Sequence, residues 1–267
     1  MADDAWEAVT TALTDPERLL AHFTLAADLT TLRGECRFAR SERALVARYD
    51  GLPFAALAFW GEDPGELAGL ATRLVDPGEV FYLLLNEQQM RPAERAFAVE
   101  QVRPEWQMLF MGDPAELDPG DATELGPEHL EGMRDLAAEA GLMALEVDPF
   151  RHGPAFGVWA EGTARESPLL VAMGATHLAV PGGAEIGNVA TRTTHRRRGL
   201  ARQVVAALVR AHAAQGRRVF LMVFQTNRAA VLLYESLGFV RLRPMFLMRC
   251  RLRAKGRFLE TWERLRT

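Results

Sequence analysis

The stretch "THRRRGLARQ", residues 194–203, places three consecutive arginines and a glycine directly before an apolar, helix-forming run. A strand-like segment, residues 184–192, precedes it, and the clearest helical pattern of the chain, residues 199–216, follows it. A helix N-terminus exposes unpaired N–H groups and carries about +0.5 elementary charge, so it binds anions. Gly199 lets a diphosphate approach the backbone without a Cβ in the way. The stretch therefore predicts a phosphate-binding turn.

Two other interpretations of the arginines are a solvated helix entrance without a ligand and a nucleic-acid patch. The chain has 31 Lys and Arg against 35 Asp and Glu, a net charge of −4. A general nucleic-acid binder usually carries a basic domain, so the charge disfavours a nucleic-acid partner. The solvated entrance stays open on local physics alone.

Length and composition indicate two domains with a sizeable core, since the chain has 267 residues and 49% of them are hydrophobic. The two cysteines, Cys36 and Cys250, lie far apart and suggest neither a zinc site nor a disulfide framework, which favours a reducing, cytoplasmic location. The acidic N-terminus lacks a signal-peptide pattern, and no apolar run approaches the roughly 20 residues needed to span a bilayer. We expect no metal and no membrane partner.

The first half predicts a small α+β domain over residues 1–115. We expect helices over 1–40, a hairpin over 43–60, a helix over 65–74, a strand over 79–86, a helical turn over 91–96 and two strands over 97–112. Its larger aromatic side chains are expected in the core of this domain: Trp60, Phe81, Tyr82, Trp106 and Phe110. Gly, Pro and Asp concentrate near 112–120, which we interpret as the domain boundary.

The second half, residues 120–267, predicts a further α+β domain. We expect a short strand over 121–125, a helix over 126–141, an irregular connection over 142–153, antiparallel strands over 155–162 and 167–180, and a strand over 184–192. After the helix over 199–216 follow a buried strand over 217–224, a helix capped by Asn227 and ended by Gly238, and two last strands over 239–244 and 246–253. The sequence contains no visible internal repeat.

Residues 196–201 fit the Arg/Gln-x-x-Gly-x-Gly/Ala acyl-CoA signature of the GNAT superfamily of N-acetyltransferases. Downstream, "NRAAVLLYESLGF" (227–239) resembles that superfamily's block Asn-x-x-Ala-x-x-x-Tyr-x-x-x-Gly-Phe. The resemblance covers residues 120–250 and implies a mixed, mostly antiparallel sheet with a splayed central strand pair, flanked by helices. The order of the two halves resembles the glycine N-acyltransferase-like branch, which implies that the first domain is a degenerate GNAT-like half.

The resemblance also implies a set of cofactor-binding residues for acetyl-CoA or another acyl-CoA. The pantetheine arm would pair with the backbone of the first splayed strand, and the pyrophosphate would lie on the N–H groups of the arginine-rich turn, with Asn227 near the arm or its strand. The residues concerned are Val189, Ala190, Thr191, Arg196, Arg197, Arg198, Gly199, Leu200 and Ala201. A backbone N–H near Val189 would polarise the thioester carbonyl.

Two residues are the catalytic candidates. Tyr234 falls in the second block and would act as general acid toward the leaving thiolate; the alternative is a core tyrosine. Glu185 lies where histone acetyltransferases of this superfamily carry a glutamate base; the alternatives are an exposed charge at a hairpin end, or a water chain with no dedicated base.

Weaker candidates lie around these positions. His177 lies on a strand and could face the substrate, although a structural histidine is the commoner case. Glu146, Asp148 and His152 lie where family members build the acceptor wall, and His195 adjoins the arginines. Cys250 is interpreted as a small core residue.

The expected function is therefore that of a cytoplasmic, acyl-CoA-dependent N-acyltransferase, with an amine attacking directly in a ternary complex. The acceptor would be a small-molecule or peptide amine. The rival from another class is a non-catalytic acyl-CoA-binding sensor. The first domain would form a wall over the acceptor site or a homodimer surface, or be a structural remnant.

Overall fold

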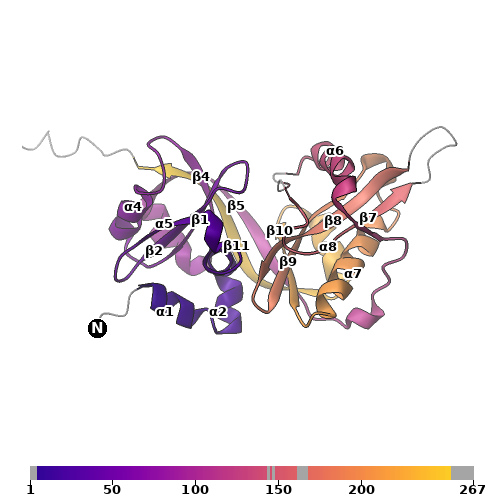
Figure 1. The fold of residues 1–267 in the computed structure, drawn as a ribbon, viewed down its shortest axis with the longest axis horizontal. Coiled ribbons are helices and arrows are strands. Elements are labelled where there is room, and N and C mark those ends of the chain that lie inside the picture. The colour runs from indigo at the N-terminus through magenta and orange to yellow at the C-terminus, as the bar shows by residue number, and fades with distance from the viewer. Residues whose placement is uncertain (1–4, 143–144, 146–147, 161–167, 254–267) are drawn as a thin grey trace, which may run out of the picture.

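The computed structural model describes every residue except 1–4, 143–144, 146–147, 161–167 and 254–267. One sheet of eleven strands runs through the described residues in the order β1-β2-β3-β4-β11-β5-β10-β9-β8-β7-β6. Figure 1 shows two lobes, with β1–β4 in one, β6–β10 in the other, and the long strands β5 and β11 running between them. The mixed α+β class expected from the sequence is confirmed.

The first lobe begins with three short helices and continues as a strand-rich unit. Its elements are α1 (Ala5–Ala12), α2 (Pro16–Ala21), α3 (Phe23–Leu29), β1 (Cys36–Arg40), β2 (Leu45–Tyr49), β3 (Ala55–Trp60), α4 (Pro64–Ala71), β4 (Val80–Asn86), α5 (Glu87–Ala96) and β5 (Phe97–Phe110). The all-helical prediction over 1–40 is wrong at its end, because residues 36–40 pair with β2 as a strand. The predicted hairpin is β2 with β3, and the helical turn over 91–96 extends over all of α5.

The second lobe follows the predicted order closely. Its elements are β6 (Thr123–Leu125), α6 (Leu130–Ala140), β7 (Ala155–Ala160), β8 (Leu169–Val180), β9 (Gly183–Thr191), α7 (Leu200–Ala213), β10 (Arg218–Phe224), α8 (Arg228–Glu235) and β11 (Phe239–Leu252). The predicted helix over 126–141 begins as a 3₁₀ turn, Pro127–His129, before α6.

Two predicted strand pairs are each one long strand. Residues 97–110 form β5 and residues 239–252 form β11, and the two pair with each other along their whole length. The prolines that suggested breaks, Pro104 and Pro244, lie inside these strands. Each proline stands directly before the segment that acquires a second neighbour: β5 pairs with β10 from Glu105, and β11 pairs with β4 from Met245. A missing N–H is tolerated there because the preceding segment is an open edge on that side.

The same order of elements occurs in both lobes. In the first, β3, α4, β4, α5 and β5 follow one another, and β3 pairs in parallel with β4; in the second, β9, α7, β10, α8 and β11 do the same, and β9 pairs in parallel with β10. The origin of the first lobe as a degenerate GNAT-like half stays a prediction, although this repeated order agrees with it.

The helices cover both faces of the sheet in the second lobe. Helices α7 and α8 pack on one face, against a cluster that includes Met108, Leu221 and Phe239. On the other face, α1–α3 pack on Leu109, Phe220 and Met245. Trp106 and Phe110 pack against the α7–α8 cluster, so their predicted place in a separate first-domain core is wrong.

Candidate active site

The parallel pair β9–β10 opens partway along its length. Only three residues of each strand pair, and the last pair joins Glu185 to Phe220. Both strands continue, β9 to Thr191 and β10 to Phe224. Burial follows the separation, since residues 183–186 are buried whereas residues 187–189 are half-exposed. The resemblance predicted a splayed pair here, and the register confirms it.

A β-bulge lies on β9 at the level of this opening. Met173 pairs with Ala190 and Ala175 with Gly187, so two residues of β9, Asn188 and Val189, face one residue of β8. Asn188 has φ of 54°, in the left-handed region. A bulge leaves one residue outside the ladder and re-aims its backbone groups. The predicted carbonyl-polarising N–H near Val189 therefore lies where the backbone leaves regular pairing.

The arginine-rich turn has two left-handed residues, Arg197 with φ of 66° and Gly199 with φ of 78°. The left-handed region is unfavourable for residues with a Cβ, by about 1–2 kcal/mol, so Arg197 is a strained position of the kind that clusters at binding sites. Gly199 is the N-cap of α7, and no side chain caps this helix end. A Cβ built on Gly199 would meet nothing within 4 Å. The space above the helix end is open, which fits the anion cradle.

The side chains around the turn divide into anchored and free cations. Arg196 donates to the carbonyl of Thr191 at 3.3 Å, whereas Arg197 and Arg198 are exposed and have no ion pair among the described residues. Glu139 of α6 accepts from the N–H of Thr193 at 3.0 Å, and this bond is the leading cause of the lowering of its pKa. The turn is thus held from β9 and α6 and keeps two arginines available.

Helix α8 begins beside the open slot. Asn227 caps it as predicted, because its side-chain oxygen accepts from the N–H of Ala230 at 3.2 Å. Arg202 of α7 donates to the hydroxyl of Ser236 at 2.5 Å, which ties the two helices together. A contact of Asn227 with a pantetheine arm stays a prediction.

Tyr234 lies on α8 and faces the cluster under α7 and α8. It is 8% exposed, and its ring packs edge-on against Phe239 at 5.8 Å. Among the described residues no group forms a hydrogen bond with its hydroxyl. Burial raises the pKa of Tyr234 to about 12, so the phenol keeps its proton at neutral pH. These properties suit a general acid, and its role stays a prediction.

Glu185 is 5% exposed, so it is not an exposed charge at a hairpin end. It pairs with Phe220 and Leu178, which both face α1–α3, so its side chain lies on that face. Tyr234 lies on the opposite face. The two candidates thus lie on opposite faces of the sheet, and the role of Glu185 as a base stays a prediction.

The weaker candidate residues of the sequence analysis do not lie together in one site. His177 lies next to Gly187 of β9, because a Cβ on that glycine would come within 3.0 Å of His177 Cβ. His152 is buried, and His195 interacts with its neighbour Thr194 at 2.9 Å. Asp148 accepts from the N–H of Phe150, a turn contact, and Glu146 lies outside the described residues.

The sequence interpretation missed three residues at this end of the sheet. They are Glu139, which holds the arginine-rich turn, Asn188, which forms the bulge, and Glu105, a buried carboxyl on β5 beside β10. An Asn within a strand-like run favours the left-handed region and was the only signal for Asn188. Nothing in the sequence marks the other two.

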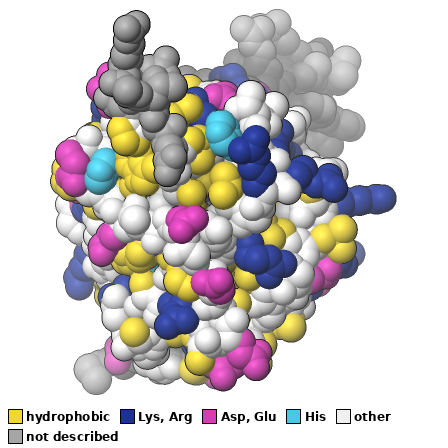
Figure 2. Space-filling model, turned by 90° about the vertical axis from the view of Figure 1, so that its right-hand side faces the viewer, with side chains coloured by type: hydrophobic (Ala, Val, Ile, Leu, Met, Phe, Trp, Pro, Cys, Tyr) yellow, Lys and Arg dark blue, Asp and Glu magenta, His cyan; other side chains and the backbone are white. Residues whose placement is uncertain are grey.

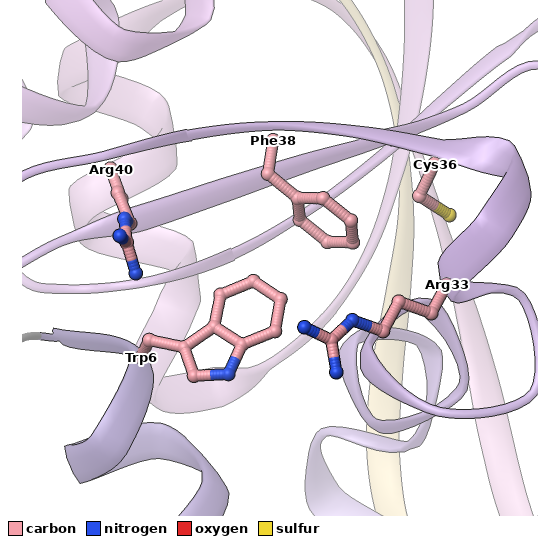
Figure 3. Close-up of a pocket in the computed structure, with 5 residues that line it drawn as sticks. All are labelled: Trp6, Arg33, Cys36, Phe38 and Arg40. Atoms are coloured by element: carbon pink, nitrogen blue, oxygen red, sulfur yellow. The ribbon is translucent and has the colours of Figure 1, made fainter.

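Two cavities lie in the first lobe, and a third, of about 520 Å³, lies between α1–α3 and the second-lobe residues 181–183, Gly216 and Arg218. A shallow one of about 440 Å³ lies between α1 and β1, where Arg33 and Arg40 stand on either side of Trp6, with Phe38 edge-on to the indole (Figure 3). Another of about 470 Å³ lies where β3 and β4 end, at the first turns of α4 and α5. Neither adjoins the arginine-rich turn.

The surface of the second lobe carries both charges, and acidic and basic side chains both occur on the face in Figure 2. Within the described residues no group of three His, Cys, Asp or Glu could hold a metal ion. None of the helices that the structure describes has the length and apolar character to cross a membrane.

Comparisons with known proteins agree with this geometry. The model of the FR47-like protein family matches residues 162–247, and no curated protein matches the chain. A structure from Novosphingobium aromaticivorans, described as an acetyltransferase of the GNAT family, is 26% identical with a TM-score of 0.69 and covers 88% of this chain and 99% of that one.

Two more distant structures share the fold of both lobes. A GCN5-related N-acetyltransferase from Kribbella flavida is 18% identical with a TM-score of 0.60, covering 90% of this chain and 98% of its own. A tandem GNAT protein from the clavulanic acid biosynthesis pathway is 12% identical with a TM-score of 0.57, covering 92% and 97%. The glycine N-acyltransferase branch stays a prediction. The FR47-like match over residues 162–247, the 26% identical GNAT-family structure and the splayed strands support the GNAT superfamily, and the two more distant structures show the same fold.

Proposed function

We propose that the chain is an acyl-CoA-dependent N-acyltransferase that transfers an acetyl group from acetyl-CoA to a primary amine. The observation that carries the proposal is the parallel pair β9–β10, which separates after Glu185 and Phe220 beside an open, uncapped helix end at Gly199. A slot between strands and an anion cradle at its mouth are what a long thioester with a diphosphate requires.

The chain's own groups then have distinct tasks. The N–H groups from Arg197 to Ala201 hold the diphosphate, and Arg197 and Arg198 add charge at its rim. Acetyl-CoA, when bound, supplies an activated acyl group as a thioester. The N–H at Val189 polarises the carbonyl, and the phenol of Tyr234 gives its proton to the leaving sulfur.

In the described part of the first lobe, the place that corresponds to the cradle at Gly199 is occupied. At the corresponding place, the carboxylate of Asp63 caps α4 and accepts from the N–H of Glu66 at 2.7 Å. Gln89 donates to the carbonyl of Phe59 at 3.0 Å and so occupies the backbone of β3. A negative cap and a filled strand edge oppose a diphosphate, so the proposal has a single acyl-CoA site.

The test is a thiol-release assay with acetyl-CoA and a panel of primary amines, together with a melting curve in acetyl-CoA. A ligand at 100 times its Kd adds about 2.7 kcal/mol of stability. We expect a rise in Tm and release of CoA with at least one amine. If no CoA ester raises the Tm, the helix end at Gly199 does not bind the diphosphate. If acetyl-CoA binds tightly but no amine releases CoA, the non-catalytic acyl-CoA sensor is favoured.

A further inference from the structure

Glu105 is a buried carboxyl from the first lobe that lies beside the open strand β10. It is 7% exposed, and among the described residues no group forms a hydrogen bond with its side-chain carboxylate. Buried carboxylates in proteins are nearly always paired or hydrogen-bonded, because an uncompensated one is costly. The oxygens of Glu105 are not among the fully enclosed polar atoms that lack a partner, so the carboxylate remains accessible to a group that approaches it.

The strand pairing places Glu105 beside the part of β10 that has left β9. The last β9–β10 pair joins Glu185 to Phe220, and β10 continues to Phe224. Phe224 is the partner of Glu105 on β5. Glu105 is thus one strand beyond the slot.

The side chain of Glu105 lies on the face away from α7 and α8. Its neighbours Phe224 and Met245 are its partners on the two adjoining strands, and Met245 belongs to the cluster under α1–α3. Glu185 lies on this same face, whereas Tyr234 lies on the other. An acceptor amine that reaches the slot from the α1–α3 face would arrive on the side of Glu105.

The loop after β10 fixes this strand. Gln225 donates its side-chain N–H to the carbonyl of Glu105 at 3.2 Å, and its backbone N–H to the carbonyl of Pro104 at 3.0 Å. The backbone of Glu105 is therefore tied to the end of β10, just where that strand borders the slot.

The charged groups that face Glu105 leave it available to a cation. Burial raises the pKa of Glu105 to about 7, and Arg103, whose guanidinium lies 3.7 Å from the centre of the Phe224 ring, opposes the rise. On β11, Arg243 is paired with Glu17 at 3.0 Å. On the helical side His22 is neutral, because burial lowers its pKa to about 4.

We propose that Glu105 is the carboxylate that receives the acceptor amine as an ammonium ion and takes its first proton, so that the first lobe completes the active site of the second. The inference rests on the proposed function and adds that the acceptor is cationic. In the reaction, the amine nitrogen forms a bond to the acetyl carbonyl carbon while the bond from that carbon to sulfur breaks. Of the two protons the ammonium loses, one goes to Glu105 and on to solvent, and the other replaces the one Tyr234 gave to sulfur.

The activity test compares Glu105→Gln and Glu105→Asp with the wild type, using the best acceptor among tyramine, spermidine and an unblocked tripeptide. For Glu105→Gln we expect kcat/KM to fall on the order of 100-fold. The rise of kcat/KM with pH near pH 7, which titration of Glu105 would cause in the wild type, should also disappear. Glu105→Asp should recover part of the loss, and the Tm rise with acetyl-CoA should stay unchanged in both. Glu100→Gln, an exposed position on the same strand, is the matched control.

A second measurement works without turnover. With ¹³C-labelled glutamate, the NMR titration of Glu105 in the presence of CoA should shift to lower pH when methylammonium is added, since a nearby cation favours the ionised carboxylate. Methanol, the uncharged control, should not change the pH midpoint of the Glu105 titration. An active wild type with an equally active Glu105→Gln variant, or a titration that methylammonium does not move, overturns the inference alone. An inactive wild type without a Tm rise overturns the proposed function instead.

Discussion

The carboxylate of Glu139, near the end of α6, accepts a hydrogen bond from the backbone N–H of Thr193 in the turn that leads to α7. The same carboxylate accepts from the guanidinium of Arg192. The arginine-rich turn is therefore held by a helix that lies more than fifty residues earlier in the sequence. Under the proposed function the N–H groups of the turn point together at one anion, so their orientation depends on this contact.

Replacing Glu139 by Ala should therefore raise the Kd of acetyl-CoA several-fold without abolishing its binding. The turn loses its anchor to α6 but keeps its glycine and arginines. Isothermal titration calorimetry with acetyl-CoA measures the change. Glu131→Ala, on the same helix and exposed, should bind like the wild type, and an unchanged Kd for Glu139→Ala would show that β9 alone holds the turn.

Gly199→Glu should abolish the rise in Tm that acetyl-CoA produces. The new side chain brings a negative charge to the helix end that we propose receives the diphosphate. It also imposes a left-handed conformation on a residue with a Cβ, at about 1–2 kcal/mol. Gly216→Glu is the matched control, because Gly216 also has a positive φ, of 69°, and open space, just after the other end of α7. Both variants should lose similar stability without ligand, yet only Gly216→Glu should respond to acetyl-CoA.

Tyr234→Phe should lower kcat on the order of 100-fold and leave the Kd of acetyl-CoA unchanged. The substitution removes only a hydroxyl that has no hydrogen-bond partner among the described residues, so packing against Phe239 remains. Steady-state kinetics and calorimetry separate the two effects. Tyr82→Phe, on β4 of the first lobe, controls for the loss of a tyrosine hydroxyl elsewhere. If kcat of Tyr234→Phe stays at the wild-type value, the tyrosine is a packing residue.

The local parts of this site could be predicted from the sequence, because each is set by neighbouring residues. A glycine before an apolar helical run specifies the open helix end, and Asn227 specifies the cap of α8. The continuity of β5 and β11, and their pairing with each other between the two lobes, could not be predicted in this way. Pro104 and Pro244 interrupt the apolar pattern, and the partner of a strand is a property of the whole sheet rather than of the strand.

The contacts of two functional candidates, Glu105 and Glu139, could not be predicted from the sequence either. Glu105 lies between Pro104 and Trp106 in a segment with several charges, and it is buried between the neighbouring strands that carry Phe224 and Met245. Glu139 looks like any surface glutamate of a helix, because its partner Thr193 comes only after β7, β8 and β9 in the sequence. Both depend on contacts between segments far apart in the sequence.

Glu105 should also make stability fall as the pH rises from about 4.5 to above 7. Its pKa in the folded chain, about 7, is above the ordinary 4.5, so the folded state binds more protons in this window. Its contribution is fully present below 4.5 and lost as the pH rises through 7, up to about 3 kcal/mol at 1.36 kcal/mol per pKa unit. The buried His212, with a pKa lowered to about 4, acts in the opposite direction below 6.5.

Urea unfolding of the wild type and Glu105→Gln at pH 5 and pH 8 isolates this contribution, because His212 is common to both proteins. We expect the variant to gain stability relative to the wild type at pH 8 but not at pH 5. An equal difference at both values would mean that Glu105 is ionised in the folded chain at pH 5.

Acetyl-CoA should bind with a stoichiometry of one per chain, although both lobes have the same order of strands and helices. In the second lobe the helix after the first parallel strand, α7, begins at Gly199 without a side-chain cap; in the first lobe the corresponding helix, α4, is capped by the carboxylate of Asp63. The cap satisfies an N–H that would otherwise face a phosphate, and its charge repels one. Calorimetry should give one site in the wild type, none in Gly199→Glu and still one in Asp63→Ser. A second site in the wild type that Asp63→Lys strengthens would instead mean that the first lobe also binds the thioester.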